Sequence, residues 1–191
     1  PEDNYAGLIR KLHITNLNNI DISFEGLDGL PLIIPYGITN AGLKNMRRLM
    51  EAFVEVKNLE EKAPLFKAKV KPTDSPNVEV LEQGNFYLGF EQGPEGATLL
   101  NPIVDPELIF GQQNNYSFPE KFLDESILDI LDHQAIENRL PSAMSLFRKQ
   151  LGAGETYTVT SVIGHADSRE ALNRLIPIIT KADYINSKAQ T

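Results

Sequence analysis

Short stretches in which apolar and polar residues alternate recur along the chain, and they restrict its fold more than any other feature. Ile20, Ile22 and Phe24 alternate with polar residues in IDISFE, and TYTVTSVIGHA (156–166) is also rich in β-branched residues. Successive side chains of a strand point to opposite faces, so such stretches predict strands with one buried face. About seven to nine strands, mostly antiparallel, predict a mainly β fold: an antiparallel β-sandwich with a few helical insertions and a C-terminal helix.

The segment FEGLDGLPLIIPYGI (24–38) is apolar enough to be buried, yet glycines and prolines interrupt it. Its glycine and aspartate residues at 26–29 predict a tight turn, and Pro31 and Pro35 then bracket a short buried strand, LPLII. The preceding stretch LIRKLHITN also looks extended. An Asn-rich turn at 16–19 therefore predicts that the first two strands form a hairpin.

Three segments have the periodicity of amphipathic helices. Asn40 would cap the first, in which Met46 lies on the apolar face. The second is FLDESILDILD (122–132). In the third, DSREALNRLIPIITKA, Asp167 has the spacing of a capping box, and Pro177 should kink or shorten the helix.

Further stretches predict how side chains are divided between the two faces of a strand. LFKAKVK places Lys67, Lys69 and Lys71 on one face, which we interpret as a solvated face or a lysine-protected sheet edge, with an anion site as the alternative. NVEVLE and NFYLGF predict two more strands, and in the second Tyr87 lies on the face opposite Phe86 and its apolar neighbours. The residues that follow, 91–119, predict a long loop or a decorated connection.

Charge and composition exclude several classes of function. The chain has 191 residues, of which 26 are acidic and 18 basic, and its net charge of −8 argues against nucleic acid or an anionic membrane as a partner. The absence of cysteine excludes disulfides, thiolate catalysis and cysteine zinc sites, and it suits a cytoplasmic protein. The apolar runs are too short to span a bilayer.

Catalytic motifs are weak. His13, His133 and His165 are isolated, without the spacing of a helical metal site, so no metal is expected; His165, close to Asp167 at a strand end, is the most plausible functional histidine. The sequence contains no G-x-S-x-G motif. Carboxylates are plentiful, but a glycosidase pair depends on geometry that the sequence does not give.

Three stretches taken together resemble a known family. They are ITNLNNIDISFEGLDGLPLIIPYGI, LKNMRRLMEAFVEVKNLEEKAPLFKAK, and NPIVDPELIFG with GHADSREALNRL. Their order is similar to the N-terminal sandwich domain of the inverting carbohydrate phosphorylases of the cellobiose, chitobiose and β-1,3-glucan type, formerly grouped as glycosyltransferase family 36.

The resemblance implies a supersandwich of the mutarotase-like type that supports a separate catalytic barrel. Residues 1–182 would form the sandwich, and residues 183–191 would begin a linker to an (α/α)6 barrel. That barrel would hold the general acid and bind inorganic phosphate as co-substrate, with no other cofactor. The partner would be a β-linked oligosaccharide or glucan, and the sandwich could bridge two subunits of a homodimer. No catalytic residue is carried over to this chain.

Several polar residues are candidates for contacting carbohydrate or a neighbouring domain. Sugar sites combine planar polar and aromatic side chains. The stretch FGQQNNYSF has this composition, but so do exposed loops in general. In the segment 24–38, only Asp28 and Tyr36 have polar groups that could reach a ligand or a neighbouring domain, and we expect both to serve packing. The candidates are Asp28, Tyr36, Gln112, Gln113, Asn114, Tyr116 and His165.

Three functions fit these observations. The first is an accessory sandwich domain of a glycoside phosphorylase-like enzyme, non-catalytic by itself, which supports the barrel and the substrate entrance. The second is a free-standing carbohydrate-binding sandwich. The third is a small enzyme of mutarotase or lyase type, which would require a histidine with carboxylates on the concave face of a sheet.

Overall fold

The computed structural model describes residues 5–112, 115–124, 131 and 133–189. It is mainly β, with antiparallel sheets and few helices, which confirms the predicted fold class. Its strands are β1 (Gly7–Thr15), β2 (Ile22–Leu30), β3 (Val54–Lys57), β4 (Leu65–Ala68), β5 (Gly84–Gly93), β6 (Gly96–Leu99), β7 (Asn101–Ile103), β8 (Ala143–Leu151) and β9 (Thr156–Ala166). Its helices are α1 (Asn40–Ala52), α2 (Glu107–Phe110), α3 (Glu120–Asp124), α4 (Arg169–Ile179) and α5 (Ala182–Ala189).

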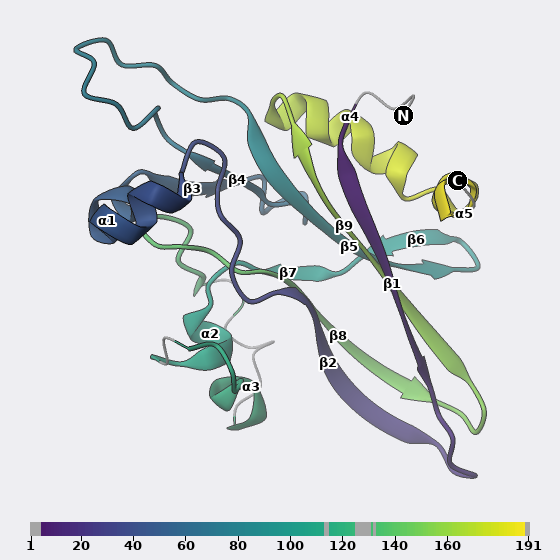
Figure 1. Ribbon diagram of the computed structural model, residues 1–191. Coiled ribbons are helices and arrows are strands. Elements are labelled where there is room, and N and C mark those ends of the chain that lie inside the picture. Colours follow the sequence, from purple (N-terminus) through teal and green to yellow (C-terminus); the bar gives the residue numbers. More distant parts are fainter. Residues whose placement is uncertain (1–4, 113–114, 125–130, 132, 190–191) are drawn as a thin grey trace.

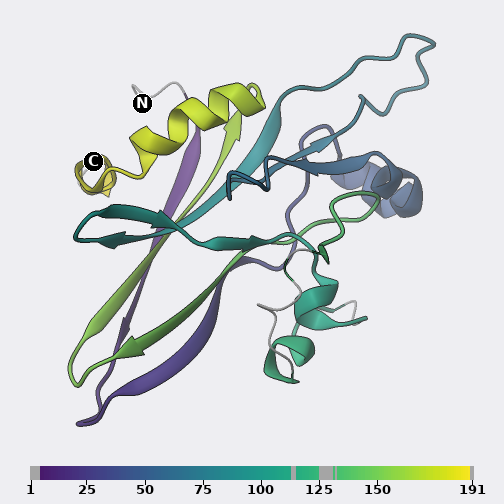
Figure 2. The same ribbon diagram turned by 180° about the vertical axis from the view of Figure 1, so that it is seen from behind.

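The strands form two antiparallel sheets (Figure 1). The larger sheet has the order β1-β9-β5-β4-β3, with β6 also paired to β5, and the smaller sheet has the order β2-β8-β7. Helices α4 and α5 cover one face of the larger sheet near the N-terminal end of β1, as both views show (Figures 1 and 2). None of the helices in the described part of the chain has the length and apolar character needed to cross a membrane.

Alternating side chains of β5 divide the core as the sequence predicts. Phe86, Leu88 and Phe90 pack with α4 and α5 on one side of the larger sheet, in a cluster that includes Leu172 of α4. Tyr87 points to the other side and is fully buried. The period of two along β5 therefore separates two layers of the core.

The predicted hairpin of the first two strands is wrong. β1 pairs with β9 and β2 pairs with β8, so the two strands belong to different sheets. The buried Asn16 holds the turn between them, because its amide nitrogen donates to the carbonyls of Ile20, Leu151 and Gly152. The turn thus passes from one sheet to the other and is fixed to the turn between β8 and β9.

The predicted turn at 26–29 and the strand LPLII are also wrong. β2 continues through both glycines to Leu30, and residues 31–35 contain no strand. A Cβ atom on Gly26 would lie 2.4 Å from the ring of Phe147 on β8, so this glycine admits an aromatic ring against the strand. The glycines therefore serve close packing within a strand rather than a reversal of the chain.

The helix boundaries differ from the predictions by one residue. Thr39, not Asn40, caps α1, and Ser168, not Asp167, caps α4, each hydroxyl accepting from a backbone N–H three residues later. Pro177 lies inside α4 without ending it. Met46 is 52% exposed and has non-helical backbone angles, so it does not share the buried face of α1.

Parts of the region 77–132 also depart from the sequence predictions, although β5 does not. NVEVLE, predicted to be a strand, forms none, and the connection 91–119 contains β6, β7 and α2. The first residues of the predicted helix 122–132 belong to α3, and residues 125–130 and 132 lie outside the described residues.

Lys67 does not lie on a solvated face or a sheet edge. β4 lies between β5 and β3, and Lys67 is only 6% exposed. Its ammonium group donates to Glu55 Oε1 at 2.5 Å and to the carbonyl of Leu81 at 2.7 Å. Lys57 reaches the other carboxylate oxygen of Glu55 at 3.0 Å. A buried lysine is thus tolerated because its charge is paired.

We predict that Glu55 contributes stability that is lost in acid. Burial alone would raise the pKa of Glu55, but hydrogen bonds and charge interactions with Lys67 and Lys57 outweigh it and lower the pKa below the ordinary value of 4.5. The contribution is therefore complete above the unfolded-state pKa and disappears as the pH falls through the folded-state pKa. Urea unfolding at a series of pH values should show that the stability gap between the wild type and Glu55→Gln narrows below about pH 4.5.

The matched control is Glu95→Gln, because Glu95 is exposed in the turn between β5 and β6. Its stability profile should follow that of the wild type. A constant gap between the wild type and Glu55→Gln over the whole pH range would contradict the prediction.

Candidate functional site

A polar cleft lies between α1, α2 and the loop that precedes β8. It has a volume of about 540 Å³. Figure 1 shows α1 and α2 on the same side of the molecule. We call it the α1–α2 cleft, and its polar lining is Arg47, Arg48, Glu51, Glu107, Gln112, Tyr116, Asn138 and Arg139.

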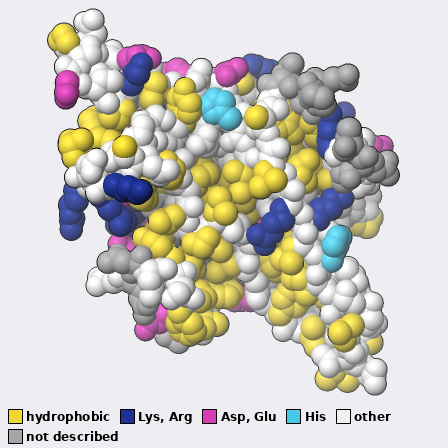
Figure 3. Space-filling model, viewed as in Figure 1, with side chains coloured by type: hydrophobic (Ala, Val, Ile, Leu, Met, Phe, Trp, Pro, Cys, Tyr) yellow, Lys and Arg dark blue, Asp and Glu magenta, His cyan; other side chains and the backbone are white. Residues whose placement is uncertain are grey.

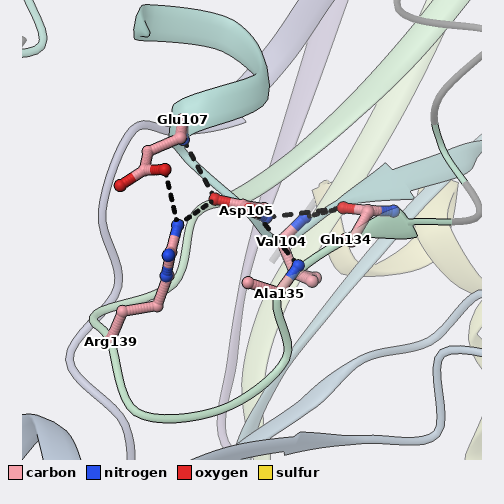
Figure 4. Close-up of polar contacts among 6 residues, drawn as sticks. All are labelled: Val104, Asp105, Glu107, Gln134, Ala135 and Arg139. Carbon is pink, nitrogen blue, oxygen red and sulfur yellow. Dashed lines mark hydrogen bonds and ion pairs between the residues drawn. The ribbon is translucent and has the colours of Figure 1, made fainter. Parts of the chain in front are cut away.

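A buried carboxylate organises one wall of the cleft (Figure 4). Asp105 is 5% exposed; its Oδ1 accepts from the backbone N–H of Glu107 at 3.0 Å, and its Oδ2 accepts from that of Ala135 at 3.0 Å. Arg139 Nη1 donates to Asp105 Oδ1 at 2.9 Å and lies 3.1 Å from Glu107 Oε2. Asp105 therefore ties α2, the loop and the arginine together.

The neighbouring carboxylates of Asp105 and Glu107 stabilise the positive charge of Arg139. Burial alone would lower the pKa of the guanidinium, but Asp105 and Glu107 raise it above its ordinary value. Gln134 supports the same wall: its Oε1 accepts from the backbone N–H of Val104 at 2.7 Å and its Nε2 donates to the carbonyl of Pro102 at 2.9 Å. These contacts hold both the guanidinium of Arg139 and the loop that carries it in place.

The opposite wall carries two neighbouring arginines of α1. Arg47 donates to Glu51 Oε1 at 2.8 Å, one helical turn away, and this hydrogen bond raises the pKa of Arg47. Within the described part of the chain, Arg48 forms no ion pair, and its side chain lines the cleft. One guanidinium is therefore oriented by a carboxylate and the other is available to a ligand.

The structure brings two of the predicted residues to this cleft. Gln112 and Tyr116 line it, whereas Gln113 and Asn114 lie outside the described residues. Tyr116 packs edge-on against Phe110, with ring centroids 5.4 Å apart. Its φ of 51° places a bulky residue in the left-handed region, a strain that clusters at binding sites.

Tyr36 and His165 meet at a second place, outside the lining of the cleft. Their ring centroids are 4.9 Å apart. Asn85 Oδ1 lies 3.4 Å from His165 Nδ1, and Asn85 Nδ2 donates to the carbonyl of Ile34 at 2.9 Å. The contacts join the segment after β2 to the ends of β5 and β9, so both aromatic residues take part in packing.

Asp28 lies inside the sandwich and is 2% exposed. Its carboxylate accepts from Arg10 on β1 and, at 2.8 Å, from Ser161 Oγ on β9, and the Tyr87 hydroxyl donates to its backbone carbonyl at 2.9 Å. Burial raises the pKa of the Tyr87 hydroxyl, which keeps it a donor. Asp28 thus links the two sheets, and its side chain has no open route to a ligand.

The histidines do not assemble a catalytic group in the described residues. His13 pairs with the Thr158 hydroxyl at 2.8 Å, His133 is exposed, and the contacts of His165 are with Asn85 and Tyr36. No group of three histidine, aspartate or glutamate residues in this part of the chain could hold a metal ion. The arrangement required by a mutarotase-like or lyase-like enzyme is thus not seen among these residues.

Comparison with protein-family models and with curated proteins found no match to this chain.

Sequence reasoning missed Asp105, Gln134 and Arg139. The first had a local signal, because an aspartate before Pro-Glu-Leu is typical of a turn whose carboxylate accepts from the first N–H groups of a helix. The other two are surface-type residues in an irregular loop, and only folding brings them to Asp105.

Proposed function

We propose that this chain is an accessory β-sandwich domain of a cytoplasmic, glycoside phosphorylase-like enzyme, and that it is non-catalytic by itself. In the whole enzyme, an (α/α)6 barrel would supply the general acid and the phosphate site. The α1–α2 cleft would contact a β-linked oligosaccharide at the substrate entrance. The resemblance of the sequence to the sandwich domains of inverting carbohydrate phosphorylases supports this context.

The observation that carries the proposal is the polar lining of the α1–α2 cleft. Planar guanidinium and amide groups offer paired donors to neighbouring sugar hydroxyls, and Arg48, Gln112 and Arg139 place such groups around one open space. Tyr116 adds an aromatic ring. A cleft of about 540 Å³ lies in the size range of small-ligand sites.

The carboxylates of the cleft suit binding rather than catalysis. Glu51 accepts from Arg47, and Glu107 and Asp105 both contact Arg139. Each acidic group therefore orients a guanidinium instead of standing free to transfer a proton to or from a substrate.

We predict that the chain binds short β-1,3- or β-1,4-linked glucooligosaccharides with a dissociation constant on the order of 1 mM, measured by titration calorimetry. Gln112→Ala should weaken binding by about three- to tenfold, because it removes one hydrogen-bonding amide. Gln150→Ala is the matched control, because Gln150 is exposed on β8, away from the cleft. It should leave the affinity unchanged.

Two outcomes would contradict different parts of the proposal. The absence of binding heat with every oligosaccharide would reject the cleft as a sugar site. Release of a sugar phosphate by this chain alone, in the presence of oligosaccharide and phosphate, would reject its non-catalytic role.

A further inference from the structure

We propose that the outer edge of β1 is a docking site for an extended, acidic segment of a partner polypeptide, which adds a strand to the larger sheet. This interaction surface is separate from the α1–α2 cleft and does not depend on the proposed function. β1 is the terminal strand of its sheet, and it is paired with β9 along all of its nine residues. The edge is therefore nine residues long and paired with β9 along its whole length.

Two hydrogen bonds show which backbone groups of β1 point away from β9. The His165 N–H donates to the Ala6 carbonyl at 3.1 Å, and the Asn16 N–H donates to the Glu155 carbonyl at 2.9 Å. In an antiparallel pair, every second residue exchanges both of its backbone bonds with the partner strand. Both bonds continue the β1–β9 register and both involve even-numbered residues. The even-numbered residues of β1 thus bond to β9.

The odd-numbered residues consequently direct their N–H and C=O groups to the free edge. They are Gly7, Ile9, Lys11, His13 and Thr15. Among the residues that the structure describes, these backbone groups have no hydrogen-bond partner. A row of such groups is the template that an added strand requires.

A groove of about 470 Å³ runs beside the N-terminal half of this edge. One wall is β1 from Gly7 to Lys11, and the other includes Tyr184 and Lys188 of α5. Leu8 lines it and is 68% exposed. The groove gives an added strand a partly apolar surface for alternate side chains, in addition to the backbone edge.

Charge selects the kind of segment that fits. β1 carries two cations and no acidic residue, although the chain has a net charge of −8. Arg10 is already paired with Asp28, whereas Lys11, which faces the free edge, donates among the described residues only to the neutral Oδ1 of Asn186 at 2.8 Å. Figure 3 shows Lys and Arg side chains among apolar ones over the middle of the face that β1 crosses, with acidic side chains mainly near its margins. A second copy fits less well, because the antiparallel register that uses all five outward-facing residues places Lys11 opposite its own copy. A carboxylate-bearing strand is favoured.

The test uses the whole chain and capped seven-residue peptides that alternate valine with either glutamate or lysine. Amide hydrogen exchange of the chain, followed by NMR, should slow by roughly tenfold or more at Ile9, Lys11 and His13 with the glutamate peptide, and much less with the lysine peptide. Lys11→Glu should reverse the preference. Exchange at even-numbered residues, which bond to β9, should change little.

Proline variants test the edge without altering its charge at Lys11. In His13→Pro the lost N–H points outward, so the β1–β9 ladder stays intact while docking weakens by about tenfold or more. In Leu12→Pro the lost N–H bonds to β9, so the fold itself should be weakened. Unchanged docking in a folded His13→Pro variant would overturn the proposal.

Three other results would also overturn it: no protection of β1 by either peptide, equal protection by both, or protection that grows with protein concentration alone. The last result would assign the edge to a second copy of the chain.

Discussion

Replacing Gly29 by alanine is expected to lower the free energy of unfolding by about 4 kcal/mol or more. A Cβ atom at this position would lie 2.1 Å from the carbonyl oxygen of Ala143 and 2.7 Å from the Cα of Met144. Both are backbone atoms of β8, which pairs with β2 over its whole length, so neither can move aside. The φ of 135° at Gly29 adds strain for any residue with a side chain.

The Gly96→Ala variant measures the cost of the positive φ without the steric clash that a Cβ atom meets at Gly29. Gly96 has a similar φ of 123°, but a Cβ atom there would meet nothing within 4 Å. Its replacement should therefore cost only the backbone strain, about 1–2 kcal/mol. Urea unfolding of both variants measures the difference. Equal losses would show that the close approach of β2 and β8 does not determine the cost at Gly29.

Asp28→Ala is expected to lower the free energy of unfolding by about 3 kcal/mol. The change removes a buried carboxylate that binds Arg10 of β1 and Ser161 of β9. It leaves the Ser161 hydroxyl without its acceptor in the core between the sheets. Although Arg10 can turn toward water, the link from β2 to the larger sheet is lost.

The control for Asp28 is Asp21→Ala, since Asp21 is exposed just before the same strand. It should change stability by less than about 0.5 kcal/mol. The Arg10→Ala variant and the double variant complete a cycle, in which the two losses should not add. A stability of Asp28→Ala within that small range would contradict the structural role of Asp28 and reopen its role in ligand binding.

The local alternation of residue types was sufficient to predict strands whose two faces differ in their surroundings. β5 and β9 lie where NFYLGF and TYTVTSVIGHA predict them, and Tyr87 is separated from Phe86 as alternation requires. The sequence pattern was misleading in the glycine-containing part of β2, because its composition resembles that of a turn. Gly26 and Gly29 lie inside β2, because a glycine also allows another strand or ring to approach closely.

The candidate site was only partly predictable. The composition of FGQQNNYSF indicated Gln112 and Tyr116, and both line the cleft. Arg48, Asp105 and Arg139 come from three distant segments, and nothing local distinguishes these residues from ordinary surface residues. Their importance depends on which segments meet.

By itself, the sequence determined the mainly β class, the strands β1, β2, β4, β5 and β9, and the alternation of faces, because side-chain direction in a strand depends only on neighbours along the chain. Tertiary structure alone decided that β1 pairs with β9 and β2 with β8, that Lys67 is buried against Glu55, and that three arginines surround one cleft. These features depend on contacts between residues far apart in the sequence. Such contacts are chosen by the packing of the whole chain and leave no local periodic signal.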